Sequence, residues 1–404
     1  MIEDEMGRQR GSEDTFRAVT ILILFIIAIA LVSFGESFYS TFMGGFLKEC
    51  GIPVAEIGVF FSAFSVAALF AIPAGYVSDR LGRNIIVVFL FAMAVVGFSY
   101  TLANTRGELL LLRAAHGAVA TSIFLIARAY IMDKTTKKNR GRIMGVFALL
   151  IGTFALLISV MTSTFGGSLR DQTGSFDPLF YKAAIFPLIA AILLLITVRD
   201  MRKFTIQRTM QPHRKLFSNR SFITILVMFA VLRFASSILT PIMPIFAVQE
   251  LGMSYTQLGS LFLYVGILHA VFAFIGSALS DFFGRKNLIL YPLIIYAAAL
   301  FVAGLSNNHQ MFSTAYIFIA IGAATYAVVA YCLIGDVVVQ EHRGTACGVV
   351  ILMSGIGYFF GPPLGSAIGG IFGLQIPYFV SSLMVVAIVV MLFFVLPQDR
   401  DVAA

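Results

Sequence analysis

Long runs of apolar residues, each about long enough to cross a bilayer, alternate along the chain with short polar loops. A transmembrane helix needs about 20 apolar residues, whereas a transmembrane β-barrel strand gives an alternating segment of about ten. With a window of about 19 residues, the pattern predicts an all-α membrane protein. It has twelve predicted transmembrane helices, at 18–43, 57–76, 84–103, 109–131, 143–166, 179–198, 222–248, 257–280, 288–305, 311–335, 345–371 and 376–396.

The composition excludes most other classes of protein. Of 404 residues, 59% are hydrophobic and 12% are charged, whereas a soluble globular chain carries about 25% charged residues. The three cysteines fit neither a disulfide framework nor a metal site. The phosphate-binding pattern G-x-x-x-x-G-K-[ST] is absent, which disfavours a primary pump. We therefore expect neither an enzyme nor a bound cofactor or metal.

The basic residues predict the orientation in the bilayer. If the N-terminus is cytoplasmic, 22 of the 28 Lys and Arg residues lie in or next to cytoplasmic segments and four lie in or next to the outer loops. This distribution follows the positive-inside rule and places both termini, 1–17 and 397–404, in the cytoplasm. It also accounts for the net charge of +8 without nucleic acid as a partner. We expect a multi-pass protein of the cell membrane.

The two predicted six-helix bundles, 18–198 and 221–396, carry matching loop residues. They are separated by a basic cytoplasmic linker at 199–220. The matching pairs are spaced by 202 or 203 positions: Asp79 and Asp281, Gly82 and Gly284, Arg83 and Arg285, Asp133 and Asp336. Parallel repeats of this kind place a substrate site between the halves, near the bilayer midplane.

The loop after the second helix reads Gly75-Tyr-Val-Ser-Asp79-Arg80-Leu-Gly82-Arg83-Asn84. Together with the duplicated six-helix unit, it resembles the major facilitator superfamily. The resemblance implies two bundles that rock around a central cavity, giving alternating access to a small-molecule substrate. It also implies a cytoplasmic gate, for which the candidates are Gly75, Asp79, Arg80, Gly82, Arg83, Asp133, Asp281, Arg285 and Asp336. Gly361 and Pro362 in the eleventh helix predict a bent gating element.

Three charged residues lie deep within the predicted helices, where charge is costly and usually functional. Glu36 lies about 18 residues into the outward-running first helix, and Arg113 about five residues into the inward-running fourth helix. Their depths therefore agree, which predicts an ion pair inside the N-terminal bundle. Arg233 lies near the middle of the seventh helix, and His269 lies near the middle of the eighth. Both are candidates for substrate binding in the cavity.

The sequence Arg113-Ala-Ala-His116-Gly117 resembles the helix-four signature R-x-x-Q-G of proton-coupled members, with His116 in place of glutamine. The resemblance implies that Glu36 and Arg113 couple transport to protons, and it makes His116 a further cavity candidate. The antiporter branch of the family carries a glycine-proline motif on helix five, but 143–166 contains no proline. This departure counts against a drug–proton antiporter and leaves the direction of transport open.

We therefore expect a monomeric, proton-coupled secondary transporter that uses protons and a small organic solute, with a preference for efflux of amphipathic compounds. One alternative is a proton symporter that imports an organic anion or a sugar, which Arg233 and His269 favour. A membrane sensor or a lipid scramblase on the same frame is an alternative from another class.

Overall fold

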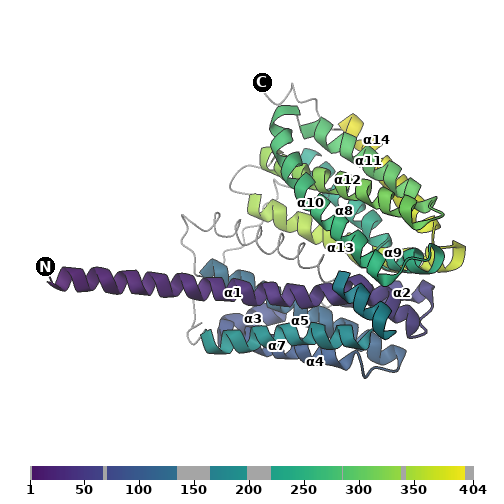
Figure 1. Cartoon of the computed structure of the whole chain (residues 1–404). Coiled ribbons are helices and arrows are strands. Elements are labelled where there is room, and N and C mark those ends of the chain that lie inside the picture. Colours follow the sequence, from purple (N-terminus) through teal and green to yellow (C-terminus); the bar gives the residue numbers. More distant parts are fainter. Residues whose placement is uncertain are drawn as a thin grey trace. The chain divides into compact units, whose positions relative to one another are not determined.

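A computed structural model describes residues 2–66, 71–133, 164–197, 220–283, 285–337 and 343–395. Within these ranges the backbone is helical between short turns and contains no strand. The described elements are α1 (Ile2–Glu49), α2 (Val54–Val66), α3 (Ala71–Leu81), η2 (Arg83–Ile85), α4 (Ile86–Ser99), α5 (Arg106–Asp133), α7 (Asp177–Thr197), α8 (Arg220–Ile238), α9 (Ile242–Ile245), η4 (Phe246–Glu250), α10 (Tyr255–Phe283), α11 (Arg285–Gly304), α12 (His309–Val337), α13 (Arg343–Phe372) and α14 (Ile376–Val395). Figure 1 labels the α-helices among them.

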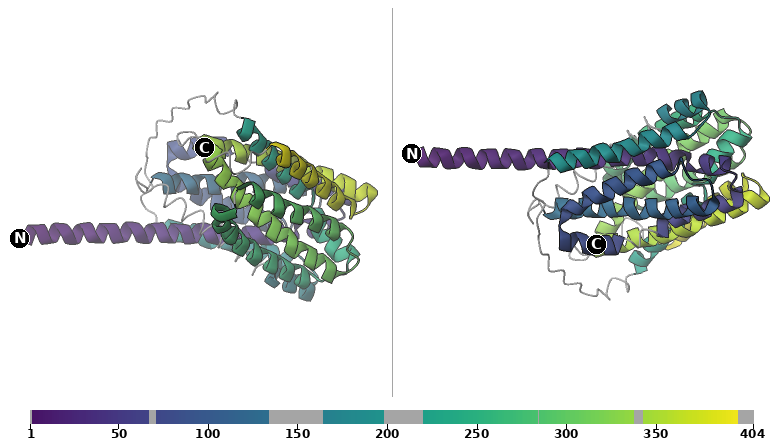
Figure 2. Two further views of the ribbon diagram at one scale, coloured as in Figure 1. Left: turned by 90° about the horizontal axis from the view of Figure 1, so that it is seen from above. Right: turned by 90° about the horizontal axis from the view of Figure 1, so that it is seen from below.

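The described helices confirm the all-helical fold class. Seven of them are long and apolar enough to cross a membrane: Thr20–Glu49, Arg106–Ala127, Asp177–Leu195, Ser221–Glu250, Tyr255–Gly276, Lys286–Gly304 and Ile376–Val395. The predicted fifth transmembrane helix, 143–166, lies outside the described residues except for its last three positions. The number of twelve and the cytoplasmic termini therefore remain predictions. Figures 1 and 2 show α1 as one uninterrupted helix.

The chain forms two compact units, and the bundles 18–198 and 221–396 stay a prediction. Unit 1 comprises Met1–Tyr39, Ala67–Ser159 and Asp177–Gln207. In its described part, small residues allow the helices to approach closely. A Cβ atom at Gly35 of α1 would clash with the backbone of Ala183 in α7, and one at Gly97 of α4 would clash with Tyr39 and Ala184. These contacts hold α1 against α4 and α7.

Unit 2 comprises Ser40–Val66, Val160–Phe176 and Arg208–Ala404. In its described part α13 packs against both α8 and α2. The glycines of α13 make this possible, because a Cβ atom at Gly361 or Gly365 would clash with α8. On the other side, Gly58 of α2 lies against the carbonyl of Pro362. The predicted gating residues Gly361 and Pro362 thus lie in a packed, continuous helix between two neighbours.

The prolines after α8 coincide with an interruption of the helix. α8 ends at Ile238, and a turn leads to Pro241 and the short helix α9. The following residues, Phe246–Glu250, form a π-helix. Proline lacks a backbone N–H and cannot continue the hydrogen-bond ladder of the preceding helix. The structure therefore has a break in the helix at this position.

Candidate functional site

A carboxylate and an imidazole meet inside unit 1. Glu36 of α1 lies with its Oε2 atom 2.8 Å from Nε2 of His116 in α5. The side chain of His116 is 1% exposed, whereas that of Glu36 is 20% exposed. The carboxyl group of Glu36 is therefore the more accessible member of this pair.

The other ring nitrogen of His116 faces two hydrogen-bond donors. Its Nδ1 atom lies 3.3 Å from the hydroxyl of Tyr100 and 3.5 Å from Nη1 of Arg113. A guanidinium group can only donate hydrogen bonds, so Nδ1 is the accepting nitrogen. Nε2 is then the ring nitrogen that donates a hydrogen bond to the carboxylate of Glu36. Glu36, His116 and Arg113 thus form one chain of hydrogen bonds.

Aromatic rings enclose the imidazole. The ring of Tyr39 lies edge-on to His116 at a centroid distance of 4.7 Å, and that of Tyr100 at 5.8 Å. Phe180 of α7 packs against both tyrosines, at 5.5 Å and 5.4 Å. Arg113 is also buried. The low dielectric of this enclosure strengthens the hydrogen bonds and makes an unpaired charge costly.

The geometry differs from the predicted ion pair of Glu36 with Arg113. The two residues belong to one cluster, as their depths suggested, but His116 lies between them. His116 was expected in a substrate cavity and instead contacts Glu36 directly. The spacing of three residues between Arg113 and His116 puts both on one face of α5, which is the sequence signal for this arrangement.

The two cavity candidates of the other unit do not share a described contact. Arg233 is exposed, and its guanidinium lies 4.8 Å from the ring centroid of Tyr358 in α13. His269 is half-buried in α10. Among the described contacts none joins His269 to Arg233 or to an acidic residue.

The loop motif after the second predicted helix has a defined backbone geometry in its described part. Gly82 has a φ of 95°, in the region that favours glycine, and it turns the chain from α3 into η2. Arg83 is buried and donates a hydrogen bond of 2.9 Å to Ser78. The guanidinium of Arg80 lies 4.4 Å from the ring centroid of Tyr76. Gly75 lies against Leu125 of α5.

Five further gating candidates have side chains outside the described residues, so the predicted cytoplasmic gate stays a prediction. They are Asp79, Asp133, Asp281, Arg285 and Asp336.

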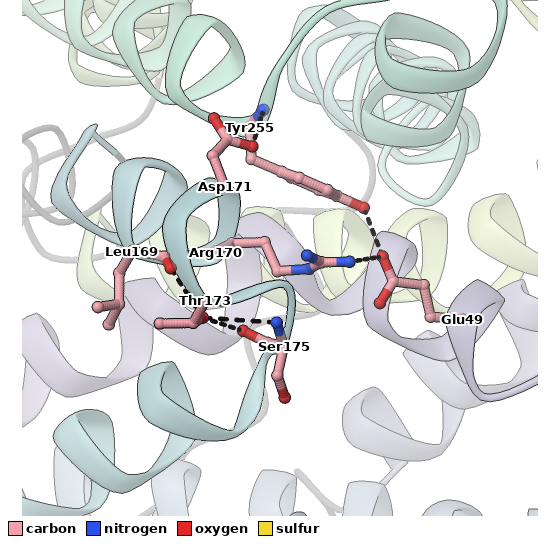
Figure 3. Close-up of polar contacts among 7 residues, drawn as sticks. All are labelled: Glu49, Leu169, Arg170, Asp171, Thr173, Ser175 and Tyr255. Atoms are coloured by element: carbon pink, nitrogen blue, oxygen red, sulfur yellow. Dashed lines mark hydrogen bonds and ion pairs between the residues drawn. The ribbon is translucent and has the colours of Figure 1, made fainter.

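A second polar cluster, which sequence analysis missed, lies in unit 2 (Figure 3). Arg170 donates a hydrogen bond of 2.6 Å to Glu49 at the end of α1, and the hydroxyl of Tyr255 donates to the same oxygen at 3.3 Å. The carboxylate of Asp171 accepts hydrogen bonds from the backbone N–H groups of Tyr255 and Thr256, at 3.1 Å and 2.8 Å. We call these five residues the loop-end cluster.

The hydrogen bonds of Asp171 change its titration. Partial burial raises the pKa of this carboxyl group, but hydrogen bonds from Thr256 and Tyr255 outweigh it and leave the pKa below its ordinary value. A lowered pKa means that the contact is fully formed above the ordinary carboxyl pKa and is lost as the pH falls through the lowered value. Near neutral pH the carboxylate therefore caps the N-terminus of α10.

Comparisons with known proteins agree with the fold. The sequence profile described as Major Facilitator Superfamily matches residues 25–233 and 225–403. The chain is 24% identical over 343 residues to Multidrug resistance protein 1 of Bacillus subtilis (strain 168), covering 82% of this chain and 84% of the relative. It is 20% identical over 331 residues to Quinolone resistance protein NorA of Staphylococcus aureus (strain COL), covering 80% and 83%.

Solved structures show the same fold at low sequence identity. A bacterial homologue of the human lysosomal transporter Spinster, in an inward-facing and occupied conformation, superposes with a TM-score of 0.76 and 17% identity, covering 93% of this chain and 96% of that chain. A D-xylose-proton symporter superposes with a TM-score of 0.72 and 16% identity, covering 95% and 98%. The profile match spans nearly the whole sequence, so the chain belongs to the Major Facilitator Superfamily and is a multi-pass membrane transporter, not an enzyme.

Proposed function

We propose that the protein exports small amphipathic compounds from the cytoplasm in exchange for protons, by alternating access and as a monomer in the cell membrane. The observation that carries this proposal is the contact of the partly accessible Glu36 with the buried His116. The names of the two bacterial relatives, a multidrug and a quinolone resistance protein, favour export. Ionisable residues inside transmembrane segments commonly form proton pathways, which favours coupling.

Glu36 is the group that gains and loses the proton in this proposal. A second proton on the imidazole of His116 would have to bind at Nδ1, which faces the hydroxyl of Tyr100 and the guanidinium of Arg113. The side chain of His116 is 1% exposed, whereas that of Glu36 is 20% exposed, so the carboxylate of Glu36 is the member of the pair that contacts water.

Protonation then weakens the link between α1 and α5. In the deprotonated state the N–H of His116 donates to a carboxylate, which is a charge-assisted hydrogen bond of about twice the strength of a neutral one. In the protonated state the same N–H donates to a neutral carboxyl group. The free energy that holds α1 against α5 therefore depends on the proton, and this dependence supplies the coupling.

In this proposal the loop-end cluster acts as a gate on the outer side of the protein. Glu49, Arg170 and Asp171 belong to the first half of the sequence, and Tyr255 and Thr256 belong to the second half. The predicted topology places all five in the outer loops. Alternating access requires the two halves to separate on the outer side, so these contacts hold that side closed and break when it opens.

Asp171→Ala is expected to favour the outward-open state. The substitution removes the acceptor for two backbone N–H groups, and the loss of such a cap costs about 1 kcal/mol, or about a fivefold change in population. Nitroxide labels at Leu102, which is 74% exposed, and at Asn307, which is exposed, report the separation of the outer ends by pulsed electron spin resonance. Cys50, Cys332 and Cys347 are replaced by serine in all samples.

Glu108→Ala is the matched control for this substitution. Glu108 also caps a helix, accepting hydrogen bonds of 2.9 Å and 3.0 Å from the backbone N–H groups of Asn104 and Thr105, but all three residues belong to the first half of the sequence. The control should leave the distance distribution unchanged. If Asp171→Ala and Glu108→Ala gave the same distribution of distances between the two labels, the gating role of Asp171 would be contradicted.

A second candidate function is import of an organic anion by proton symport. The exposed cation of Arg233 within α8 favours it, as does the missing proline motif in 143–166. The structural likeness to a D-xylose-proton symporter extends to the fold alone.

Energised cells distinguish the two directions. Cells that produce the protein are loaded with cationic, neutral and anionic fluorescent amphipathic compounds, and retention is followed before and after a protonophore is added. If the protein exports these compounds, cells that produce the wild type should retain less of them than cells that produce the Glu36→Gln variant. The protonophore should remove this difference. Higher retention of any compound in the wild-type cells would support import and contradict the proposed direction.

A further inference from the structure

Arg233 is a cation near the middle of a predicted membrane span. It lies 13 residues after the start of α8 and 17 residues before the end of the span Ser221–Glu250. Its described partner is the aromatic ring of Tyr358, and no salt bridge of Arg233 occurs among the described residues. A cation at this depth without an acidic partner is costly, which points to a partner that arrives from outside the protein.

The guanidinium is on a different face of α8 from the exposed apolar side chains. Ile223 and Val227 are 42% and 40% exposed and lie ten and six positions before Arg233. With 3.6 residues per turn, neither spacing returns to the same face. The lipid-facing side chains of α8 and the side chain of Arg233 therefore point in different directions, as expected if Arg233 faces the transport pathway.

The side of α13 next to Tyr358 is open. Gly355, one turn before Tyr358, is exposed, and a Cβ atom there would meet nothing within 4 Å. The glycines of the same helix that face α8, such as Gly361, have no such space. Tyr358 thus lies between a packed surface and an open one, with the cation of Arg233 over its ring.

We propose that Arg233 and Tyr358 form a subsite for a carboxylate carried by an aromatic or apolar compound. The planar guanidinium donates two parallel hydrogen bonds to the carboxylate. The ring of Tyr358 holds the guanidinium in place by the cation–π contact, and the aromatic body of the ligand occupies the open space beside Gly355. This inference rests on the proposed transport function and specifies its substrate as an amphipathic anion. The mid-span depth excludes a lipid headgroup as the source of the anion.

Three ligands of the same shape and different charge test the subsite. They are 2-naphthoate, the neutral 2-naphthamide and the cationic 2-naphthylmethylammonium. Because the chain contains no tryptophan, the fluorescence anisotropy of the naphthyl group reports binding to purified protein directly. The variants are Arg233→Gln, Tyr358→Leu and Tyr358→Phe. Lys286→Gln is the matched control, because Lys286 lies over the ring of Phe393 at 5.6 Å in the same unit.

Wild-type protein should bind 2-naphthoate more tightly than the other two ligands. Arg233→Gln should weaken 2-naphthoate binding by about tenfold or more, the loss expected for a hydrogen bond to a charged group, and leave 2-naphthamide unchanged. Tyr358→Leu should show a smaller loss, while Tyr358→Phe and Lys286→Gln should match the wild type. The proposal is overturned if 2-naphthoate shows no advantage over 2-naphthamide, if wild type binds no 2-naphthoate, or if Arg233→Gln behaves like Lys286→Gln.

Glu36→Gln separates this inference from the proposed function. The variant should bind 2-naphthoate as the wild type does, because Glu36 and Arg233 act in different steps. If Glu36→Gln transports normally and Arg233→Gln loses binding, coupling through Glu36 is wrong and the subsite stands. If Glu36→Gln is uncoupled and Arg233→Gln binds normally, the subsite alone is wrong.

Discussion

Glu36→Gln is expected to abolish proton-driven accumulation of substrate and to leave substrate binding and substrate exchange intact. Glutamine has the shape of a protonated glutamate, and its carbonyl oxygen still accepts the hydrogen bond from Nε2 of His116, which is 2.8 Å long in the wild type. The link between α1 and α5 therefore persists, but its strength no longer depends on pH. A variant in which the link between α1 and α5 does not respond to pH transports substrate only down the concentration gradient of that substrate.

The measurement compares uptake into proteoliposomes with and without an imposed pH gradient. The wild type should respond to the gradient, whereas Glu36→Gln should show equal rates under both conditions. Glu108→Gln is the control, because it removes an exposed acid from the helix that carries His116. His116→Gln should keep its response, because the glutamine amide can donate to Glu36 and accept from Arg113. A gradient response in Glu36→Gln would contradict the coupling role.

Arg113→Ala is expected to destabilise the protein as well as stop transport. Arg113 is 3% exposed, and its Nη1 atom lies 3.5 Å from Nδ1 of His116. Its removal leaves the negative charge of Glu36 without a balancing cation in the same buried cluster. Losing one partner of a buried charge pair typically costs about 3–5 kcal/mol, which is a large part of the stability of a single domain.

A double-mutant comparison tests this explanation. The apparent melting temperature should fall in Arg113→Ala and recover in part in the Glu36→Gln/Arg113→Ala double variant, because the second substitution removes the stranded charge. Arg113→Lys should lie between the wild type and Arg113→Ala, since it keeps the charge but not the planar fork. Equal melting temperatures in Arg113→Ala and the double variant would show that Arg113 acts through packing and not through charge.

The sequence predicted the helices well because length and hydrophobicity are local properties. α5, α7, α10 and α14 each coincide with a predicted apolar run to within a few residues. Depth along a helix is also local, so Glu36 and Arg113 were placed at one level. The rotation of each helix about its axis depends on its packing partners and not on local sequence. The sequence therefore did not predict the direct contact of Glu36 with His116.

The loop-end cluster was beyond sequence reasoning for a different reason. Its contacts join residues that are 84 to 206 positions apart in the chain. Glu49, Arg170 and Asp171 lie beside loops, where charged residues are expected for solubility alone. Nothing in their spacing distinguishes a contact between segments from a solvated side chain. The packing of α2 on α13 likewise depends on glycines, such as Gly58 against Pro362, whose partners are far apart in the sequence.

Proton movement and substrate movement measured together test proton exchange through Glu36 most directly. Proteoliposomes that contain the wild-type protein and a trapped pH indicator receive an amphipathic substrate on the outside, with no imposed gradient. The lumen should become more alkaline as substrate enters, because protons leave in exchange, and Glu36→Gln should show no pH change. Acidification of the lumen, or an unchanged signal in Glu36→Gln relative to the wild type, would contradict proton exchange through Glu36.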